Sequence, residues 1–138
     1  MSKTPSQPVK VIMDSNALFA PLELKIDIFE ELRRLLNRNV DFILLSPVKA
    51  ELELLANKEG NLRRQANFAL RLAEKCKFVP VSVSDKFTTD DAIVKVAKDW
   101  SCPVFTNDRQ LRKRLRDISL PVIYVRQKSR LEIDGLIS

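Results

Sequence analysis

Short apolar runs alternate with longer amphipathic stretches along the whole of this 138-residue chain. Five runs are predicted strands: residues 9–13, 41–45, 77–83, 104–106 and 121–125. Strand and helix in alternation predict an α/β fold, in which helices cover both faces of a central, mainly parallel sheet of about five strands. We expect the first strand to be central, because its run is short, apolar and followed by an acid.

The stretches between the strands predict five helices. These are residues 25–36, 46–57, 61–76, 90–100 and 108–116. Ser46 and Pro47 suit a helix start, with serine as the N-cap, and Gly60 follows the end of that helix. Residues 16–24 and 84–89 read as loops, the former with a helical turn. One domain over residues 9–130 is expected, between a disordered lead of residues 1–8 and a tail of residues 131–138.

Composition excludes several classes of function. Two glycines cannot build a P-loop or a dinucleotide fingerprint, and two cysteines without any histidine cannot make a zinc site. The absence of histidine also removes Ser-His and Cys-His nucleophile pairs, so hydrolysis must activate water another way, and a metal ion is the natural candidate. No apolar stretch is long enough to span a membrane and the start does not resemble a signal peptide, so we expect a cytoplasmic protein without a membrane partner.

Four acids follow the predicted strands at positions that an α/β fold would bring together. They are Asp14, Glu51, Asp90 and Asp108. Parallel strands end at one edge of the sheet, which is where open α/β folds bind ligands. Clustered carboxylates repel one another unless a hard cation lies among them. The pattern therefore predicts a site for Mg²⁺ or Mn²⁺.

Each acid also has an ordinary structural interpretation, which for Glu51 is that of an exposed glutamate inside a helix. Asp14 suits an Asx-turn after a strand, and Asp90 and Asp91 would complement the positive end of a helix. Asp108 would sit in a first helical turn capped by Asn107. Taken together these interpretations are weaker than the functional one, because capping does not require all four acids at one edge of a sheet.

The chain carries a net charge of +6, and five cations fall within eight residues: Arg109, Arg112, Lys113, Arg114 and Arg116. Most charge runs are solvated helix faces. This one begins beside Asp108, which favours contact with phosphates. Candidate RNA-binding residues are Lys49, Arg109, Arg112, Lys113 and Arg116.

The acids and their contexts resemble those of PIN-domain ribonucleases. The matching segments are residues 11–16, 46–52, 90–97 and 104–108, and the resemblance extends from Lys10 to about Arg130. Residues 22–29 and 122–127 resemble in particular the archaeal single-domain relatives of the PIN nucleases that process small-subunit pre-ribosomal RNA.

The resemblance implies a PIN-like three-layer α/β/α fold and an endoribonuclease dependent on Mg²⁺ or Mn²⁺. By it, the four acids are metal ligands, directly or through water. Asn16 and Thr106 would orient the acids and their waters. Asp90 has the spacing of the family pattern, three residues before Ile93, and Asp91 either assists it or takes its place as the ligand.

We therefore predict hydrolysis of RNA phosphodiesters in rRNA processing or ribosome biogenesis, with single-stranded or looped RNA as substrate. Few aromatic residues are available for base stacking, so sequence specificity should be weak. The alternatives are a toxin-type ribonuclease with a cognate antitoxin, or a catalytically quiet RNA-binding module of a ribosome-assembly complex. Candidate partners are RNA, ribosome-assembly proteins, an antitoxin and a second copy of the chain.

Overall fold

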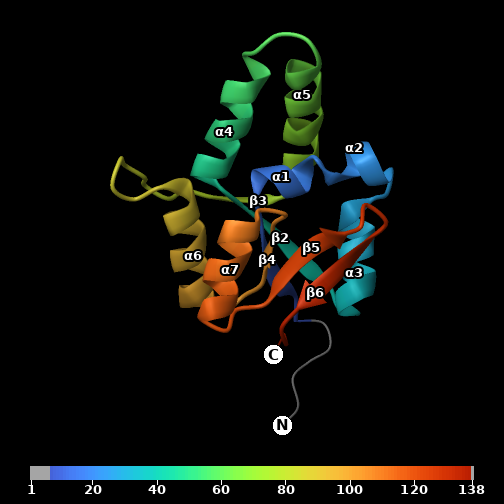
Figure 1. Cartoon of the computed structure of the whole chain (residues 1–138), viewed down its shortest axis with the longest axis vertical. Helices are drawn as coiled ribbons and strands as arrows, with labels where there is room; N and C mark the ends of the chain where they lie inside the picture. Colours follow the sequence, from blue (N-terminus) through green and yellow to red (C-terminus); the bar gives the residue numbers. More distant parts are fainter. Residues whose placement is uncertain (1–6, 138) are drawn as a thin grey trace.

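The computed structural model describes residues 7–137 and forms them into a single sheet flanked by helices (Figure 1). Its strands are β1 (Val9–Met13), β2 (Val40–Leu45), β3 (Lys77–Val79), β4 (Val104–Phe105), β5 (Val122–Arg126) and β6 (Arg130–Asp134). The order across the sheet is β3-β2-β1-β4-β5-β6, with every pair parallel except β5 and β6. The mainly parallel α/β sheet and the central first strand are confirmed.

The sheet has a sixth strand where the sequence indicated a tail. Arg130–Asp134 folds back on β5 as an antiparallel hairpin through residues 127–129, in which Gln127 and Lys128 have φ of 52° and 56°. Leu131 is 7% exposed and joins the core. Residues 131–134 are therefore part of the sheet and not a tail, with Leu131 buried in the core and Ile133 packed against it. Of the expected disordered lead, residues 1–6 lie outside the described part of the chain, and Gln7 and Pro8 are exposed.

The helices are α1 (Ser15–Leu18), α2 (Ala20–Leu24), α3 (Ile28–Leu36), α4 (Ser46–Ala56), α5 (Asn61–Ala73), α6 (Thr89–Trp100) and α7 (Arg109–Asp117). The first two occupy the stretch expected as a loop with a helical turn. The helix predicted to begin at residue 25 begins at Ile28, because Lys25 adopts a left-handed conformation that ends α2. Asp27 then caps α3, its carboxylate accepting hydrogen bonds from the backbone of Phe29 and Glu30.

Two local predictions differ from the structure near β3. The strand expected over residues 77–83 ends at Val79, because Pro80 has no N–H to continue the ladder. Ser46 is not the N-cap of α4, which Leu45 provides without a side-chain bond. The Ser46 hydroxyl instead donates to the Val81 carbonyl and accepts from the Val81 N–H, at 3.0 and 2.8 Å. It thereby fixes the chain after β3 to the start of α4.

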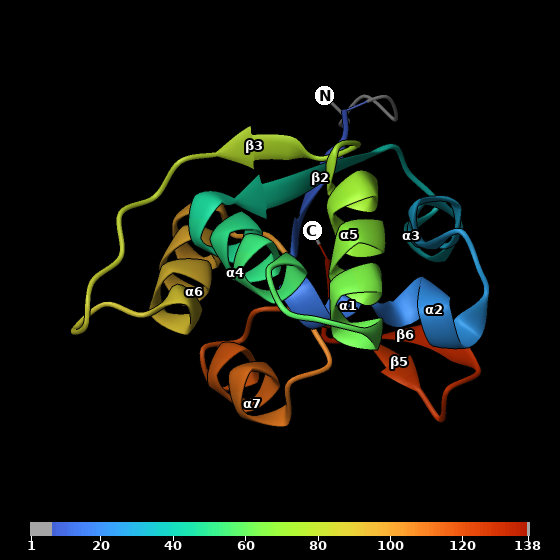
Figure 2. The same ribbon diagram turned by 90° about the horizontal axis from the view of Figure 1, so that it is seen from above.

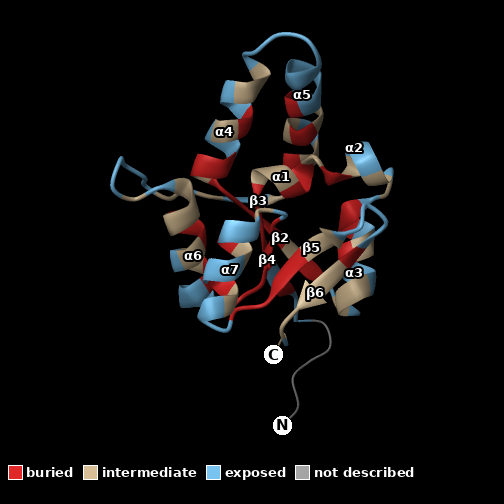
Figure 3. Cartoon of the chain, viewed as in Figure 1, coloured by how far each residue is buried: buried red, intermediate tan, exposed pale blue. Residues whose placement is uncertain are grey.

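The helices are distributed around the sheet in distinct groups. α6 and α7 lie side by side on one side of the sheet, α3 lies on the other, and α4 and α5 form a projecting hairpin (Figures 1 and 2). β1, β2 and β4 are mostly buried, the edge strands β3 and β6 are largely exposed or half-buried, and the outer faces of the helices are exposed (Figure 3). β1 is covered on both faces, with Val11, Ile12 and Met13 fully buried. No helix within residues 7–137 is both long and apolar enough to cross a membrane.

Candidate active site

Asp14 is the most enclosed of the acids that follow the strands. It comes directly after β1 and is only 5% exposed. Its backbone N–H donates a hydrogen bond to the Phe105 carbonyl of β4. Its Oδ1 accepts from the Ser15 N–H at 2.8 Å, which caps α1. Its Oδ2 accepts from the Thr106 hydroxyl at 2.7 Å and from the Asn16 amine at 3.3 Å. Asp14 is therefore held at both carboxylate oxygens.

Thr106 and Asn16 hold Asp14 from two different elements. Thr106 is fully buried at the end of β4, and its hydroxyl also accepts from the Asp108 N–H at 3.1 Å. The Asn16 side chain in α1 lies 3.5 Å from that hydroxyl, and its oxygen accepts from the Asn107 N–H at 2.9 Å. One connected set of hydrogen bonds thus links the ends of β1 and β4 around the carboxylate.

Electrostatic coupling joins the four predicted acids into one group. Burial raises the pKa of Asp14, and the charges of Asp90 and Asp108 raise it further, against the hydrogen bonds from Thr106 and Ser15. Burial also raises the pKa of Glu51, on α4, with Asp14 and Asp90 as further causes. In α6, burial and then Asp108 raise the pKa of Asp90, which Arg114 partly offsets. The four predicted acids therefore lie near enough for their charges to act on one another.

Asp91 differs from its neighbour Asp90. It forms a capping box with Thr88: each backbone N–H donates to the other residue's side chain, at 3.0 and 3.2 Å. Its Oδ1 also lies 2.9 Å from a guanidinium nitrogen of Arg114 in α7. The hydrogen bonds with Thr88 and Arg114 lower the pKa of Asp91. Asp91 is thus engaged in holding α6, whereas Asp90 interacts with the other acids.

The start of α7 differs from the expected cap at Asn107. Asp108 is the N-cap, and its Oδ1 accepts from the N–H groups of Gln110 and Leu111 at 2.8 and 3.2 Å. Asn107 instead turns toward β5, where its Oδ1 accepts from the Val125 N–H at 2.8 Å. Sequence reasoning missed this second role, since the only signal was an amide between a strand end and a helix cap.

The donor set suits a hydrated hard cation better than a closed metal cage. Within residues 7–137 no three His, Cys, Asp or Glu side chains stand close enough to enclose a metal ion. Mg²⁺ commonly binds through one or two carboxylates and keeps several waters. Asp14 would be a direct ligand in such a site, and Glu51, Asp90 and Asp108 are carboxylates near enough to act on it electrostatically. The oxygen chemistry fits Mg²⁺ or Mn²⁺.

The predicted basic residues do not form one free surface. Arg112 stacks on the Tyr124 ring at 3.6 Å, and both Arg112 and Arg116 pair with Asp134 of β6, at 3.4 and 3.3 Å. Lys113 pairs with Asp117 at 3.0 Å. Lys49 lies on α4, its ammonium 5.3 Å from the ring centre of Phe78. Within the described part of the chain, Arg109 is the member of the α7 cluster without an ion pair, and it adjoins Asp108.

Known proteins resemble this chain in sequence and in structure. Residues 11–128 match the family model described as PIN like domain. "Ribonuclease VapC4" of Methanocaldococcus jannaschii is 33% identical over 132 residues, which cover 93% of this chain and 98% of that protein. The "rRNA-processing protein fcf1" of Schizosaccharomyces pombe is 34% identical over 121 residues, covering 86% of this chain and 59% of that protein.

A solved structure described as the PIN domain endonuclease Utp24 is also similar. It superposes with a TM-score of 0.79 at 30% identity, and the match covers 97% of each chain. These findings confirm the resemblance drawn from the four acids and their contexts, and they agree with the six-stranded fold. The chain therefore belongs to the PIN-domain family of ribonucleases.

Proposed function

We propose that the protein is an endoribonuclease that depends on Mg²⁺ or Mn²⁺. The observation that carries this proposal is the buried Asp14 carboxylate directly after β1, which Thr106 and Asn16 hold at 2.7 and 3.3 Å, with the charges of Asp90 and Asp108 near enough to raise its pKa beyond the effect of burial. Bringing further negative charges toward a buried carboxylate destabilises the fold unless a cation compensates them. A cation bound at Asp14 would offset this repulsion.

The residues of the site would have two roles in hydrolysis, holding the cation and orienting the Asp14 carboxylate. Asp14, Glu51, Asp90 and Asp108 would hold the cation, directly or through water. When bound, the cation supplies a water of lowered pKa and neutralises charge on the leaving oxygen. Thr106 and Asn16 fix the Asp14 carboxylate by the bonds at 2.7 and 3.3 Å, which keeps its oxygens at one place during the reaction.

We infer that the substrate is single-stranded or looped RNA and that the reaction belongs to rRNA processing or ribosome biogenesis. Acids at the edge of a sheet reach the backbone of an unpaired strand more easily than that of a duplex. The rRNA-processing relative and the PIN endonuclease structure, at 34% and 30% identity, support this assignment. Ribosome-assembly proteins would be partners, and a cytoplasmic location stays a prediction.

A cleavage assay tests the proposal. Structured RNA with single-stranded loops is incubated with the protein and Mg²⁺ or Mn²⁺, or with EDTA. We expect cleavage only with the divalent ion, and none by Asp14→Asn. Glu53→Gln is the control, because Glu53 is exposed on α4 two residues from Glu51. Cleavage by Asp14→Asn at the wild-type rate would overturn the assignment.

A toxin-type ribonuclease with a cognate antitoxin is the second candidate function. It is favoured by the ribonuclease from M. jannaschii, which matches over 98% of its length, whereas the rRNA-processing relative matches over 59%. Expression in a host without a cognate antitoxin separates the two. Growth arrest that Asp14→Asn abolishes would support a toxin. RNA binding without cleavage in any divalent ion would instead indicate a catalytically quiet module.

A further inference from the structure

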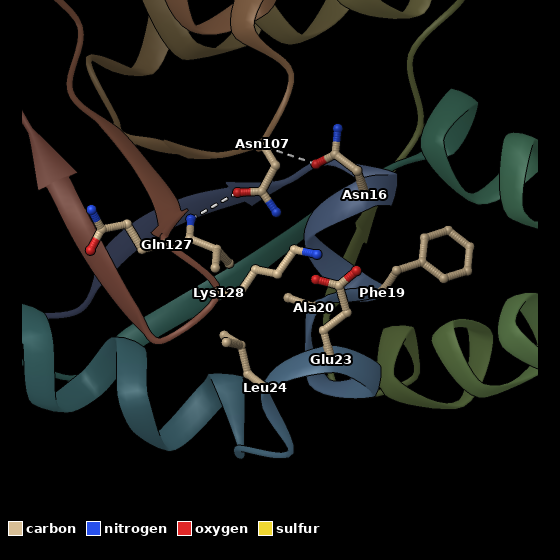
Figure 4. Close-up of a pocket in the computed structure, with 9 residues that line it drawn as sticks. Asn16, Phe19, Ala20, Glu23, Leu24, Asn107, Gln127 and Lys128 are labelled. Atoms are coloured by element: carbon tan, nitrogen blue, oxygen red, sulfur yellow. Dashed lines mark hydrogen bonds between the residues drawn. The ribbon is translucent and has the colours of Figure 1, made fainter.

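A cavity of about 400 Å³ lies beside the acid group, between α1, α2 and the β5–β6 hairpin (Figure 4). Its walls combine apolar side chains with amides, and two opposite charges stand among them. The lining residues are Asn16, Phe19, Ala20, Glu23, Leu24, Asn107, Val125, Gln127 and Lys128. A cavity of this size, with apolar walls and a few polar groups, is typical of small-ligand sites.

The cavity adjoins the predicted cleavage site through Asn16. The Asn16 amine bonds to Asp14 Oδ2 at 3.3 Å, while the same side chain forms part of the cavity wall. An RNA strand whose phosphate lies at Asp14 would therefore bring a neighbouring nucleotide to the mouth of the cavity.

One polar group of the cavity, the Asn107 side chain, is held in a fixed orientation. In an amide side chain only the oxygen can accept a hydrogen bond from a backbone N–H. The 2.8 Å bond from the Val125 N–H to Asn107 Oδ1 therefore turns the amine nitrogen of Asn107 away from β5. Figure 4 shows that amine pointing into the cavity. Lys128, from the hairpin, and Glu23, from α2, reach in from different sides (Figure 4). The cavity thus offers two donors and an acceptor above an apolar wall.

A second cavity on the other side of Asn107 suits the backbone of the RNA. It has a volume of about 490 Å³ and is lined by Arg109, Arg112, Tyr124 and Arg126, and it shares Asn107, Val125 and Gln127 with the first. Arginines are suited to phosphate, whereas amides above apolar walls are suited to the edge and face of a base. The two adjacent cavities therefore differ in the part of a nucleotide that each would accept.

We propose that the cavity between α2 and the β5–β6 hairpin binds one unpaired base of the RNA, next to the cleaved phosphate. This inference rests on the proposed ribonuclease function and adds to it a base preference at one position. The Asn107 amine and Lys128 bind base acceptors, and Glu23 binds a base donor. Leu24 and Val125 cover the apolar face of the base.

Abasic substitution tests the proposal on the unmodified protein. A single-stranded RNA that the protein cleaves is remade with one abasic ribonucleotide at each position near the cleavage site in turn. We expect kcat/KM to fall about tenfold or more at one position only, the change that follows loss of about 1.4 kcal/mol of contact. Equal cleavage of every abasic substrate would overturn the proposal.

A matched pair of variants in α2 locates the effect in the cavity. Leu24→Trp fills the cavity, whereas Leu22→Trp adds the same side chain at a residue that is 37% exposed and does not line it. Leu24→Trp should cleave intact RNA as slowly as wild type cleaves the critical abasic substrate, and Leu22→Trp should match wild type. If Leu24→Trp keeps the wild-type preference for the intact base, the cavity does not hold it.

The base inference and the ribonuclease proposal fail in different ways. Binding of short oligomers, measured in EDTA by fluorescence anisotropy, does not depend on cleavage. If no RNA is cleaved with any divalent ion, the ribonuclease proposal fails, and a single position at which the abasic residue weakens binding about tenfold still supports the base cavity. Cleavage that proceeds normally on every abasic RNA retains the ribonuclease and removes the base cavity.

Discussion

The Thr106 hydroxyl donates a 2.7 Å hydrogen bond to Oδ2 of Asp14, joining the ends of two neighbouring parallel strands. The same hydroxyl accepts from the Asp108 N–H, so one buried group serves two of the four acids. A hydroxyl can do both because it carries one donor and two acceptor sites. Thr106 therefore sets the relative position of Asp14 and the start of α7.

Thr106→Val should affect both stability and the pH dependence of cleavage. Valine keeps the shape but leaves the Asp108 N–H unpaired, which should cost about 1–3 kcal/mol in free energy of unfolding. The hydrogen bond from Thr106 lowers the pKa of Asp14, so its loss should raise that pKa. The acidic limb of the plot of cleavage rate against pH should then move to higher pH. Thr106→Ser retains the hydroxyl and should keep the wild-type limb. An unmoved limb in the valine variant would show that this bond does not tune Asp14.

Asp14→Asn should stabilise the protein without metal at neutral pH. A carboxylate whose pKa is raised in the folded state destabilises the fold once it ionises. The contribution of Asp14 to the free energy of unfolding is therefore fully present below pH 3.8, its ordinary pKa, and is lost as pH rises through the raised pKa of the folded state. Removing the charge should therefore raise Tm in EDTA at pH 7, by about 2–8 °C for each kcal/mol relieved. Below pH 3.8 the two proteins should differ little. A lower Tm for Asp14→Asn at pH 7 would show that its hydrogen bonds outweigh the repulsion.

Asp90→Asn and Asp91→Asn should have opposite effects, although the residues are adjacent. Asp90 interacts with the other acids, so its replacement should reduce cleavage strongly with little loss of stability. Asp91 completes the capping box and pairs with Arg114, so its replacement should lower the free energy of unfolding and spare most of the activity. Cleavage rates and urea unfolding measure the two effects. Loss of cleavage in a stable Asp91→Asn variant would make Asp91 the functional acid.

The contrast between Asp90 and Asp91 shows where prediction from sequence ends. The position of the acids at one edge of the sheet could be predicted from the order of strands alone, because parallel strands end at the same edge. The roles of adjacent aspartates depend on which way each side chain faces, and that is decided by Thr88 and Arg114. The strand β6 was missed for a similar reason: Arg130–Asp134 is short and charged, and only pairing with β5 makes it a strand. Likewise, the sequence predicts Arg112 and Arg116 as unpaired cations, whereas in the fold both form ion pairs with Asp134.

Divalent metal should stabilise the wild-type protein through the acid group. A ligand that binds only the folded state adds about 2.7 kcal/mol at a hundred times its Kd. We expect Mg²⁺ or Mn²⁺ to raise Tm, and the rise to shrink as pH falls, because the raised pKa values of Asp14, Glu51 and Asp90 favour protons over metal. Thermal unfolding across pH measures this. An equal rise in the Asp14→Asn/Asp90→Asn double variant would mean that the metal binds elsewhere.

Arg109 and Lys113 offer a matched test of phosphate contact on one helix. Both are exposed cations in α7. Arg109 adjoins Asp108 and lines the second cavity, the one that contains Arg112 and Arg126. Lys113 lies one turn further along the helix and pairs with Asp117. Arg109→Gln should weaken RNA binding for all sequences about equally. It should also reduce the slope of log affinity against log salt by roughly 0.7, the value for one phosphate contact on a single strand. Lys113→Gln removes the same charge and should leave the slope nearly unchanged, since its place lies outside the cavity. Equal loss of slope in both variants would mean that α7 attracts RNA only through its overall charge, and that the backbone does not lie in the cavity beside Asn107.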